Sequence, residues 1–157
     1  FALQMLEKGD AGLISFNMSE EDIELIMRQP WTMTCTDGDL VPMGSGKPHP
    51  RAYGAFPRKI ERYVIERGAV GLAAAVRSMT SLPATVYGLK DRGQVRAGAY
   101  ADLLLFDPAA VDDAATYQEP HQLAKGMETI IVNGRLVRKD GVFATELSGR
   151  VVTPERR

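Results

Sequence analysis

The sequence predicts an α/β fold: the C-terminal part of a (β/α)8 barrel of the TIM type, followed by a small β-rich part. Residues 12–36 read as strand, helix and strand, with both strands apolar on each side, which is typical of a parallel sheet covered by helices. The second strand ends at Asp37, and a loop rich in glycine and proline leads from this acid into a helix, as in the last active-site loop of a barrel. Helical spacing of apolar residues then disappears near Lys90. We therefore expect the last strands and helices of a barrel in residues 1–89 and a β-rich segment in residues 90–157.

The first elements follow from apolar spacing and from capping residues. Residues 1–8 have helical spacing, and residues 12–16 form a short apolar run that reads as a buried strand. Ser19 can cap a helix whose first turn is acidic, and Pro30 closes that helix. Residues 31–36 are rich in aromatic and β-branched side chains and predict a second strand.

A long loop and three helical segments complete the first part. Residues 39–50 contain three prolines and two glycines and predict an ordered loop. Residues 55–67 and 72–79 have apolar side chains at helical spacing, so they predict two helices. Residues 81–84 restart a short helical turn, with a proline near its first position, and this turn stops at Tyr87.

The second part carries strand signals in place of helical ones. Residues 102–106, 128–132 and 135–138 are candidate strands. The last two flank Asn133-Gly134, and this dipeptide between apolar runs is a strong signal for a tight hairpin, because both turn positions need a positive φ.

Composition and charge narrow the classes of function. Twenty acids against nineteen bases give a net charge of −1, so the sequence indicates neither a nucleic acid nor an anionic membrane as partner. The single cysteine, Cys35, excludes an internal disulfide and fits a reducing, cytoplasmic compartment. No apolar run approaches the roughly 20 residues that span a bilayer, and no signal peptide is visible. The chain begins at Phe1 in the middle of a helical pattern, as a truncated or processed chain would.

Asp37 is the first candidate for catalysis. Catalytic groups of barrel enzymes stand at the C-terminal ends of the strands, and Asp37 ends the clearest strand of the chain. A carboxylate there can take a proton from water at a metal centre and later hand it to a leaving amine. Asp39 could play the same part but lies two residues farther into the loop, so it ranks second. The alternative is that Asp37 and the glycine after it serve only as turn residues.

His49 and Arg51 are candidates for substrate binding. Pro50 fixes the backbone between a group that can exchange protons or hydrogen-bond and a permanent cation. The planar guanidinium of Arg51 suits a substrate carboxylate. The alternative is a loop histidine bonded to the backbone, beside an arginine that is paired with a structural acid.

A metal site made by this chain alone is not expected. A catalytic zinc needs about three protein ligands, and the two histidines, His49 and His121, are far apart in the sequence. Cys35 could be a ligand, but a small buried apolar role is the more common one for a cysteine. Residues 44–47 resemble a phosphate-binding loop only superficially, since the first glycine of that pattern is missing. Residues 117–122 read as a polar loop between the β-rich segments: a contact with the barrel stays open, and a solvated loop without a chemical role is favoured.

Several segments together resemble one enzyme family. They are, in order, Thr36-Asp37-Gly38, His49-Pro50-Arg51-Ala52-Tyr53-Gly54-Ala55-Phe56-Pro57-Arg58, Met79-Thr80-Ser81-Leu82-Pro83-Ala84, Gly98-Ala99-Tyr100-Ala101-Asp102-Leu103, Pro120-His121-Gln122 and Val132-Asn133-Gly134. They look like the C-terminal third of the N-acyl-D-amino-acid deacylases (D-aminoacylases) of the amidohydrolase superfamily. The Ala-Asp-Leu and Val-Asn-Gly segments are shared by many amidohydrolases, whereas the His-Pro-Arg segment is much more particular to the deacylases.

The resemblance implies a zinc-dependent barrel with a small β-sandwich that hydrolyses N-acyl-D-amino acids. It implies that Asp37 acts as general base and then as acid, that Arg51 helps to hold the substrate carboxylate, and that His49 belongs to the site in an open role. Thr36 stands where the family usually has serine and keeps a hydroxyl. The family's zinc ligands are expected upstream of this chain and none within it, so the chain alone is expected to be inactive.

Two rival interpretations stay open. One is a related amidohydrolase that acts on cyclic amides, such as a dihydroorotase-like enzyme, although the particular His-Pro-Arg loop counts against it. The other is a non-catalytic structural piece. Apolar faces of a partial barrel would be exposed, so self-association through those faces is expected.

Overall fold

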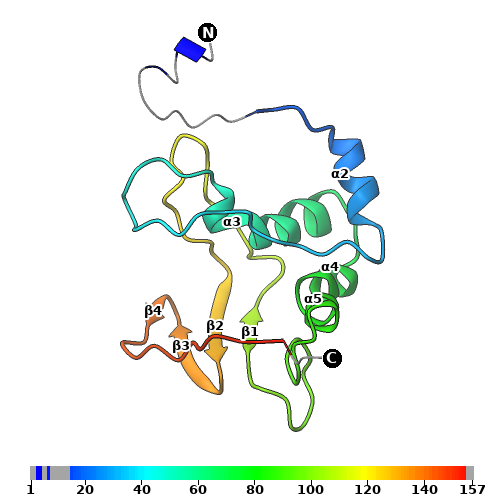
Figure 1. Ribbon diagram of the computed structural model, residues 1–157, viewed down its shortest axis with the longest axis vertical. Coiled ribbons are helices and arrows are strands. Elements are labelled where there is room, and N and C mark those ends of the chain that lie inside the picture. Colours follow the sequence, from blue (N-terminus) through cyan, green and yellow to red (C-terminus); the bar gives the residue numbers. More distant parts are fainter. Residues whose placement is uncertain (1–2, 5–6, 8–14, 155–157) are drawn as a thin grey trace.

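Helices come first along the chain and strands come last (Figure 1). The computed structural model describes residues 3–4, 7 and 15–154. Its helices are α2 (Glu20–Met27), α3 (Arg51–Arg58), the π-helix η1 (Lys59–Glu66), α4 (Leu72–Met79) and α5 (Ser81–Val86). Its strands are β1 (Leu103–Phe106), β2 (Met127–Val132), β3 (Arg135–Lys139) and β4 (Val142–Phe143).

Helix α2 begins and ends as its sequence predicts. The Ser19 side chain accepts a hydrogen bond from the Asp22 backbone N–H at 3.4 Å, which satisfies one of the unpaired donors of the first turn. The helix then attaches to η1 through polar side chains: Glu20 contacts Arg62 at 2.8 Å and Glu24 contacts Arg67 at 2.5 Å. No residue of α2 is buried, so these ion pairs rather than packing fix its position within the described part.

Helices α3 and η1 form one continuous helical rod from Arg51 to Glu66. Pro57 lies inside it and cannot donate a backbone hydrogen bond, and the helix continues past it with the wider π pattern. The sequence predicted this helix, but with a start at residue 55. The buried apolar residues lie mainly along η1 and on the small side chains that face it from α4 and α5, among them Ile60, Tyr63, Ala75 and Ala84.

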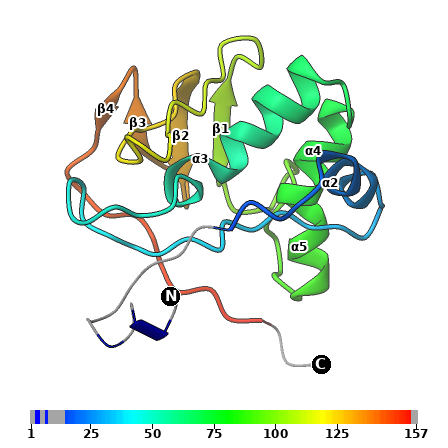
Figure 2. The same cartoon turned by 90° about the horizontal axis from the view of Figure 1, so that it is seen from above.

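The sheet is an antiparallel meander in the order β1-β2-β3-β4. Asn133 and Gly134 have φ values of 51° and 78° and form the tight turn between β2 and β3, so the predicted hairpin is confirmed. The sheet stands beside the helices, with β1 nearest to them and β4 at the far edge (Figures 1 and 2). The predicted strands at 102–106, 128–132 and 135–138 match β1, β2 and β3 to within one residue.

The predicted parallel strand pair is not observed. Residues 31–36 were expected to be a strand, but no residue among them has strand structure, so this prediction is wrong. A strand requires ladder hydrogen bonds to a neighbour, and in the described residues this segment meets a helix end instead, with the Thr34 N–H donating to the Ser78 carbonyl at 3.0 Å. The other predicted strand, 12–16, lies mostly outside the described residues, and its described part, Ser15 and Phe16, has no regular structure. The helix predicted over 1–8 also lies largely outside them.

The connection between β1 and β2 returns to the first part of the molecule. Residues 107–126 leave the sheet, run along α3 and come back (Figure 1). The Asp113 N–H donates to Glu61 Oε2 at 2.9 Å, and the Arg58 guanidinium lies 3.4 Å from the Asp113 carboxylate. This connection therefore joins the β-rich part to the middle of the helical rod, at Arg58 and Glu61.

Candidate functional site

Asp37 and Arg51 form an ion pair at the start of α3. Arg51 NH2 lies 2.8 Å from Asp37 Oδ2, and Arg51 Nε donates to the Asp37 carbonyl at 2.7 Å. Arg51 thus contacts both the side-chain carboxylate and the backbone carbonyl of Asp37. The Asp37 side chain is 77% exposed and that of Arg51 is 44% exposed, so both groups remain open to a small molecule.

The backbone around Asp37 is shaped to bring the acid onto the helix. Asp37 has a φ of 47°, a left-handed conformation that aspartate tolerates better than most residues. A Cβ at Gly38 would lie 2.8 Å from Cα of Ala52, so only glycine allows this close approach to the first turn of α3. The left-handed conformation of Asp37 and the glycine after it together set the carboxylate beside Arg51.

His49 caps the helix and keeps a defined tautomer. Its Nδ1 accepts a hydrogen bond from the Arg51 N–H at 3.0 Å, so in the neutral ring the proton is on Nε2. That Nε2 lies 3.3 Å from the Tyr117 hydroxyl, and the two rings meet edge to face with centroids 5.1 Å apart. Burial and the Arg51 charge lower the pKa of His49 from 6.5, while Asp37 opposes them. His49 is therefore a neutral, fixed group at neutral pH.

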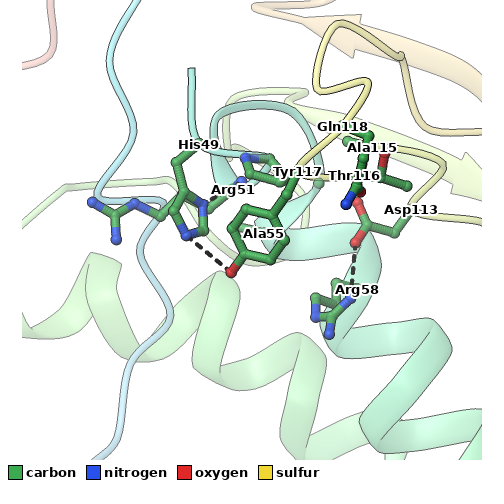
Figure 3. Close-up of a pocket in the computed structure, with 11 residues that line it drawn as sticks. His49, Arg51, Ala55, Arg58, Asp113, Ala115, Thr116, Tyr117 and Gln118 are labelled. Carbon is green, nitrogen blue, oxygen red and sulfur yellow. Dashed lines mark hydrogen bonds and ion pairs between the residues drawn. The ribbon is translucent and has the colours of Figure 1, made fainter. Parts of the chain in front are cut away.

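A cleft of about 310 Å³ lies between α3 and the returning segment 113–118 (Figure 3). His49, Arg51 and Arg58 line it from the side of α3, and Asp113 and Tyr117 line it from the returning segment. Asp113 is buried, and burial raises the pKa of its carboxyl despite the nearby Arg58. Its Oδ1 has no hydrogen-bond partner within the described residues.

Gly54 allows the two walls of this cleft to meet. A Cβ built on Gly54 would lie 1.4 Å from Asp113 Oδ1, which no real side chain can tolerate. Gly54 is the buried residue of α3, and its missing side chain is the space that the Asp113 carboxylate fills. Gly54 thus allows α3 and the segment 113–118 to pack closely against each other.

Lys59 of η1 holds the segment that ends at Asp37 through hydrogen bonds. It is buried, and its Nζ donates to Thr34 Oγ1 at 2.9 Å and to Ser78 Oγ at 2.8 Å. Burial lowers the pKa of Lys59. Residue 34 is therefore tied to both η1 and α4, three residues before the acid.

The described residues do not form a metal centre. No three side chains of the types His, Cys, Asp and Glu come together there in a group that could hold an ion. Cys35 is exposed, contrary to the buried role that the sequence favoured. The residues present thus do not fit a zinc site of the usual kind with three protein ligands, and zinc ligands elsewhere stay a prediction.

The structure brings together all three residues predicted from sequence, Asp37, His49 and Arg51. It also adds residues that sequence reasoning missed, namely Tyr117 and His121. Residues 117–122 form a loop without helix or strand, and residues 117–119 are exposed, as the sequence favoured. The open contact with the first part is present, since Tyr117 contacts His49 and His121 contacts Tyr53. The only sequence signal for them was the Pro120-His121-Gln122 motif.

Comparison with known proteins identifies the family of this chain. The Amidohydrolase family model matches residues 8–138, and the chain belongs to this family. Within it, the chain is 42% identical over 142 residues to a D-aminoacylase and 40% identical over 144 residues to an N-acyl-D-aspartate deacylase, both from Alcaligenes xylosoxydans xylosoxydans. These matches cover 90% and 92% of this chain.

Two solved structures of such deacylases are also similar to this chain. A crystal structure of D-aminoacylase matches with a TM-score of 0.80 and 42% identity over 87% of this chain and 28% of that one. N-acyl-D-glutamate deacylase from Bordetella bronchiseptica, solved with zinc and a phosphonate mimic of the tetrahedral intermediate, matches with a TM-score of 0.72 and 38% identity over 80% of this chain and 26% of that one. The chain spans 29% and 28% of the two curated relatives. No helix of the described residues is long and apolar enough to cross a membrane.

Proposed function

We propose that the full natural protein hydrolyses N-acyl-D-amino acids to a carboxylate and a free D-amino acid with the help of zinc. The observation that carries the proposal is the Asp37–Arg51 pair, with Asp37 Oδ2 and Arg51 NH2 2.8 Å apart. In an N-acyl amino acid the scissile amide nitrogen and the carboxylate are bonded to the same carbon. A group that holds the carboxylate must therefore lie within a few ångströms of a group that exchanges protons with the amide.

Arg51 can bind a substrate carboxylate without releasing Asp37. A guanidinium has five N–H donors, and the contacts to Asp37 use Nε and one NH2 direction. The remaining donors can receive a carboxylate in the planar geometry that arginine favours. His49, neutral and fixed by Arg51 and Tyr117, orients the arginine backbone from the other side.

Asp37 is proposed to act first as general base and then as general acid. It takes a proton from the attacking water and gives one to the leaving amine nitrogen. Zinc, when bound by residues outside the described part, would polarise the acyl carbonyl and lower the pKa of water. Within this chain, Arg51 orients the carboxylate of Asp37 through the contacts to its Oδ2 and to its backbone carbonyl.

The fold of the whole protein is proposed to be a barrel with a small β-sandwich. Residues 1–89 would contribute the last strands and helices of the barrel and residues 90–157 part of the sandwich; the TM-scores against D-aminoacylase structures support this. We further propose a cytoplasmic protein that acts on a small molecule and binds neither nucleic acid nor membrane, in keeping with its net charge of −1.

The rival interpretations are weaker. Relatives named D-aminoacylase, N-acyl-D-aspartate deacylase and N-acyl-D-glutamate deacylase favour a deacylase over an enzyme for cyclic amides. The non-catalytic interpretation concerns the isolated chain. Because Trp31, Leu40 and Phe16 are among many exposed apolar side chains, we propose that the isolated chain self-associates, which size-exclusion chromatography with light scattering would test.

The test measures amine release from N-acetyl-D-methionine by the full natural protein with zinc. We expect turnover of the D-isomer but not of the L-isomer, and loss of turnover with a chelator. Asp37→Asn should lower kcat about 10³-fold, the scale of a lost general base. Asp39→Asn, an exposed acid two residues away, is the matched control and should retain activity. Equal effects of the two substitutions would reject the role of Asp37.

A further inference from the structure

His121 binds the loop that joins Asp37 to His49. Its Nδ1 accepts a hydrogen bond from the Gly44 N–H at 3.2 Å, and its Nε2 lies 3.1 Å from the Gly46 carbonyl. The Tyr53 hydroxyl lies 2.9 Å from the same Nδ1, and the two rings meet edge to face with centroids 5.6 Å apart. One imidazole from the β1–β2 connection thus contacts both the loop and helix α3.

These contacts specify one tautomer of the ring. A backbone N–H can only donate, so Nδ1 of His121 must be the acceptor for Gly44. The neutral ring then carries its proton on Nε2, which donates to the Gly46 carbonyl. The Tyr53 hydroxyl, 2.9 Å from the same Nδ1, shares the single lone pair of this nitrogen with the Gly44 N–H. Both ring nitrogens of His121 therefore form hydrogen bonds with the backbone of the loop.

Residues 42–47 of the loop are all exposed, and within residues 39–48 only Val41 and Pro48 are half-buried. Leu40 is fully exposed and Met43 is 56% exposed, so neither side chain anchors the loop by packing. Gly44 and Gly46 have φ values of 79° and 64°, and a Cβ at either would meet open space. Within residues 39–48, the hydrogen bonds to other described segments run to His121.

We propose that His121 is a positioning residue: it fixes residues 39–48 and thereby holds Asp37 and His49, at the two ends of this loop, in a fixed relative position. Tyr53 orients the imidazole from α3. The catalytic consequence of this inference rests on the proposed deacylase function, whereas the structural tie does not. A loose loop would let the Asp37 and His49 ends shift, and displacement of about 1 Å is enough to reduce turnover strongly.

The experiment compares His121→Ala with Gln122→Ala in the full natural protein. Gln122 is the neighbouring residue, and among the described residues its side chain bonds only to the nearby Glu119 carbonyl, at 3.2 Å. Hydrogen exchange of the Gly44 amide is the direct readout. We expect at least tenfold faster exchange in His121→Ala and no change in Gln122→Ala. Equal exchange of Gly44 in the two variants would overturn the proposal.

Turnover of N-acetyl-D-methionine is the second readout. We expect kcat/KM to fall about tenfold in His121→Ala, to fall less in Tyr53→Phe, and to fall no further when Tyr53→Phe is added to His121→Ala, because both act through one imidazole. Additive effects, or faster exchange with unchanged turnover, would overturn the positioning role. A wild-type protein without deacylase activity would reject the proposed function instead, while Gly44 exchange still decides whether His121 holds the loop.

Discussion

The helical part and the β-rich part of this chain hold their shape by different means. The helices bury a small core in which Ile60 and Tyr63 of η1 are 4% and 7% exposed. No residue of β1 to β4 is buried, and Leu105 of β1 is 60% exposed. The sheet therefore depends on its ladder hydrogen bonds and turns, whereas η1, α4 and α5 depend on packing. The candidate site lies where the two parts meet and is built from polar contacts.

The largest loss of stability is expected from a substitution that separates α3 from the segment 113–118. Gly54→Ala would place a Cβ 1.4 Å from Asp113 Oδ1, so the returning segment must move away from α3. We expect a loss of about 2 kcal/mol in the free energy of unfolding, in the range of overpacked cores. Gly149→Ala, where a Cβ meets open space, is the control and should change little. Equal denaturant midpoints for the two variants would mean that the parts do not pack as described.

The hairpin turn should be the next most sensitive position. Gly134 has a φ of 78° without steric neighbours, so Gly134→Ala is penalised by backbone conformation alone. We expect a cost of about 1 kcal/mol. Gly134→Asn should cost less, since asparagine tolerates the left-handed region. If asparagine proved as costly as alanine in chemical denaturation, backbone conformation would not be the reason.

Sequence reasoning succeeded where the signal was local. Asn133-Gly134 defines its turn by backbone preference alone, and α4 matches the predicted range 72–79. It failed for residues 31–36, because their β propensity forms a strand only beside another strand. The early start of α3 was missed because the His49 side chain accepts from the Arg51 N–H, a contact that propensity does not contain.

The candidate site was partly predictable for the same reason. Asp37, His49 and Arg51 lie within one short stretch of sequence, so a pattern can find them. Tyr117 is 68 residues from His49, and His121 is 68 residues from Tyr53, so only the fold brings these rings together. The burial of Lys59 could not be predicted from the sequence either, because a lysine in a helix usually lies on the exposed face of that helix.

Lys59 offers a smaller test in the helical core. Its ammonium is buried, and within the described residues its partners are two neutral hydroxyls, so desolvation is not offset by an opposite charge. Lys59→Met should therefore raise the free energy of unfolding by about 1 kcal/mol at neutral pH. Lys139→Met, an exposed lysine of β3, is the control and should stay within about 0.5 kcal/mol.

The pH dependence of the Lys59 effect has a definite sign. Because burial lowers its pKa below 10.5, the folded chain binds this proton less tightly than the unfolded chain. The free energy of unfolding should then rise with pH in the range just below 10.5, and Lys59→Met should lack this rise. Destabilisation by Lys59→Met at neutral pH would instead mean that the ammonium has an anionic partner.

The smallest expected effect is a lowered pKa of the His49 ring. Burial and the Arg51 charge lower its pKa from 6.5, so an NMR titration of the ring should give a midpoint below 6.5. The unfolded state then binds the proton more tightly, so the stability from this site is present above pH 6.5 and is lost as the pH falls through the folded pKa. The same ring in urea-unfolded protein, expected at its ordinary value, is the reference.

Two substitutions separate the causes of this shift. Arg51→Gln removes the charge that lowers the pKa of His49, so the midpoint should rise toward 6.5. Asp37→Asn removes the charge that raises it, so the midpoint should fall further. Opposite movements from two residues that are themselves paired would place both charges beside the imidazole, as the geometry requires. Movements in the same direction would mean that the substitutions act by disrupting the loop, and the three groups would not form one electrostatic unit.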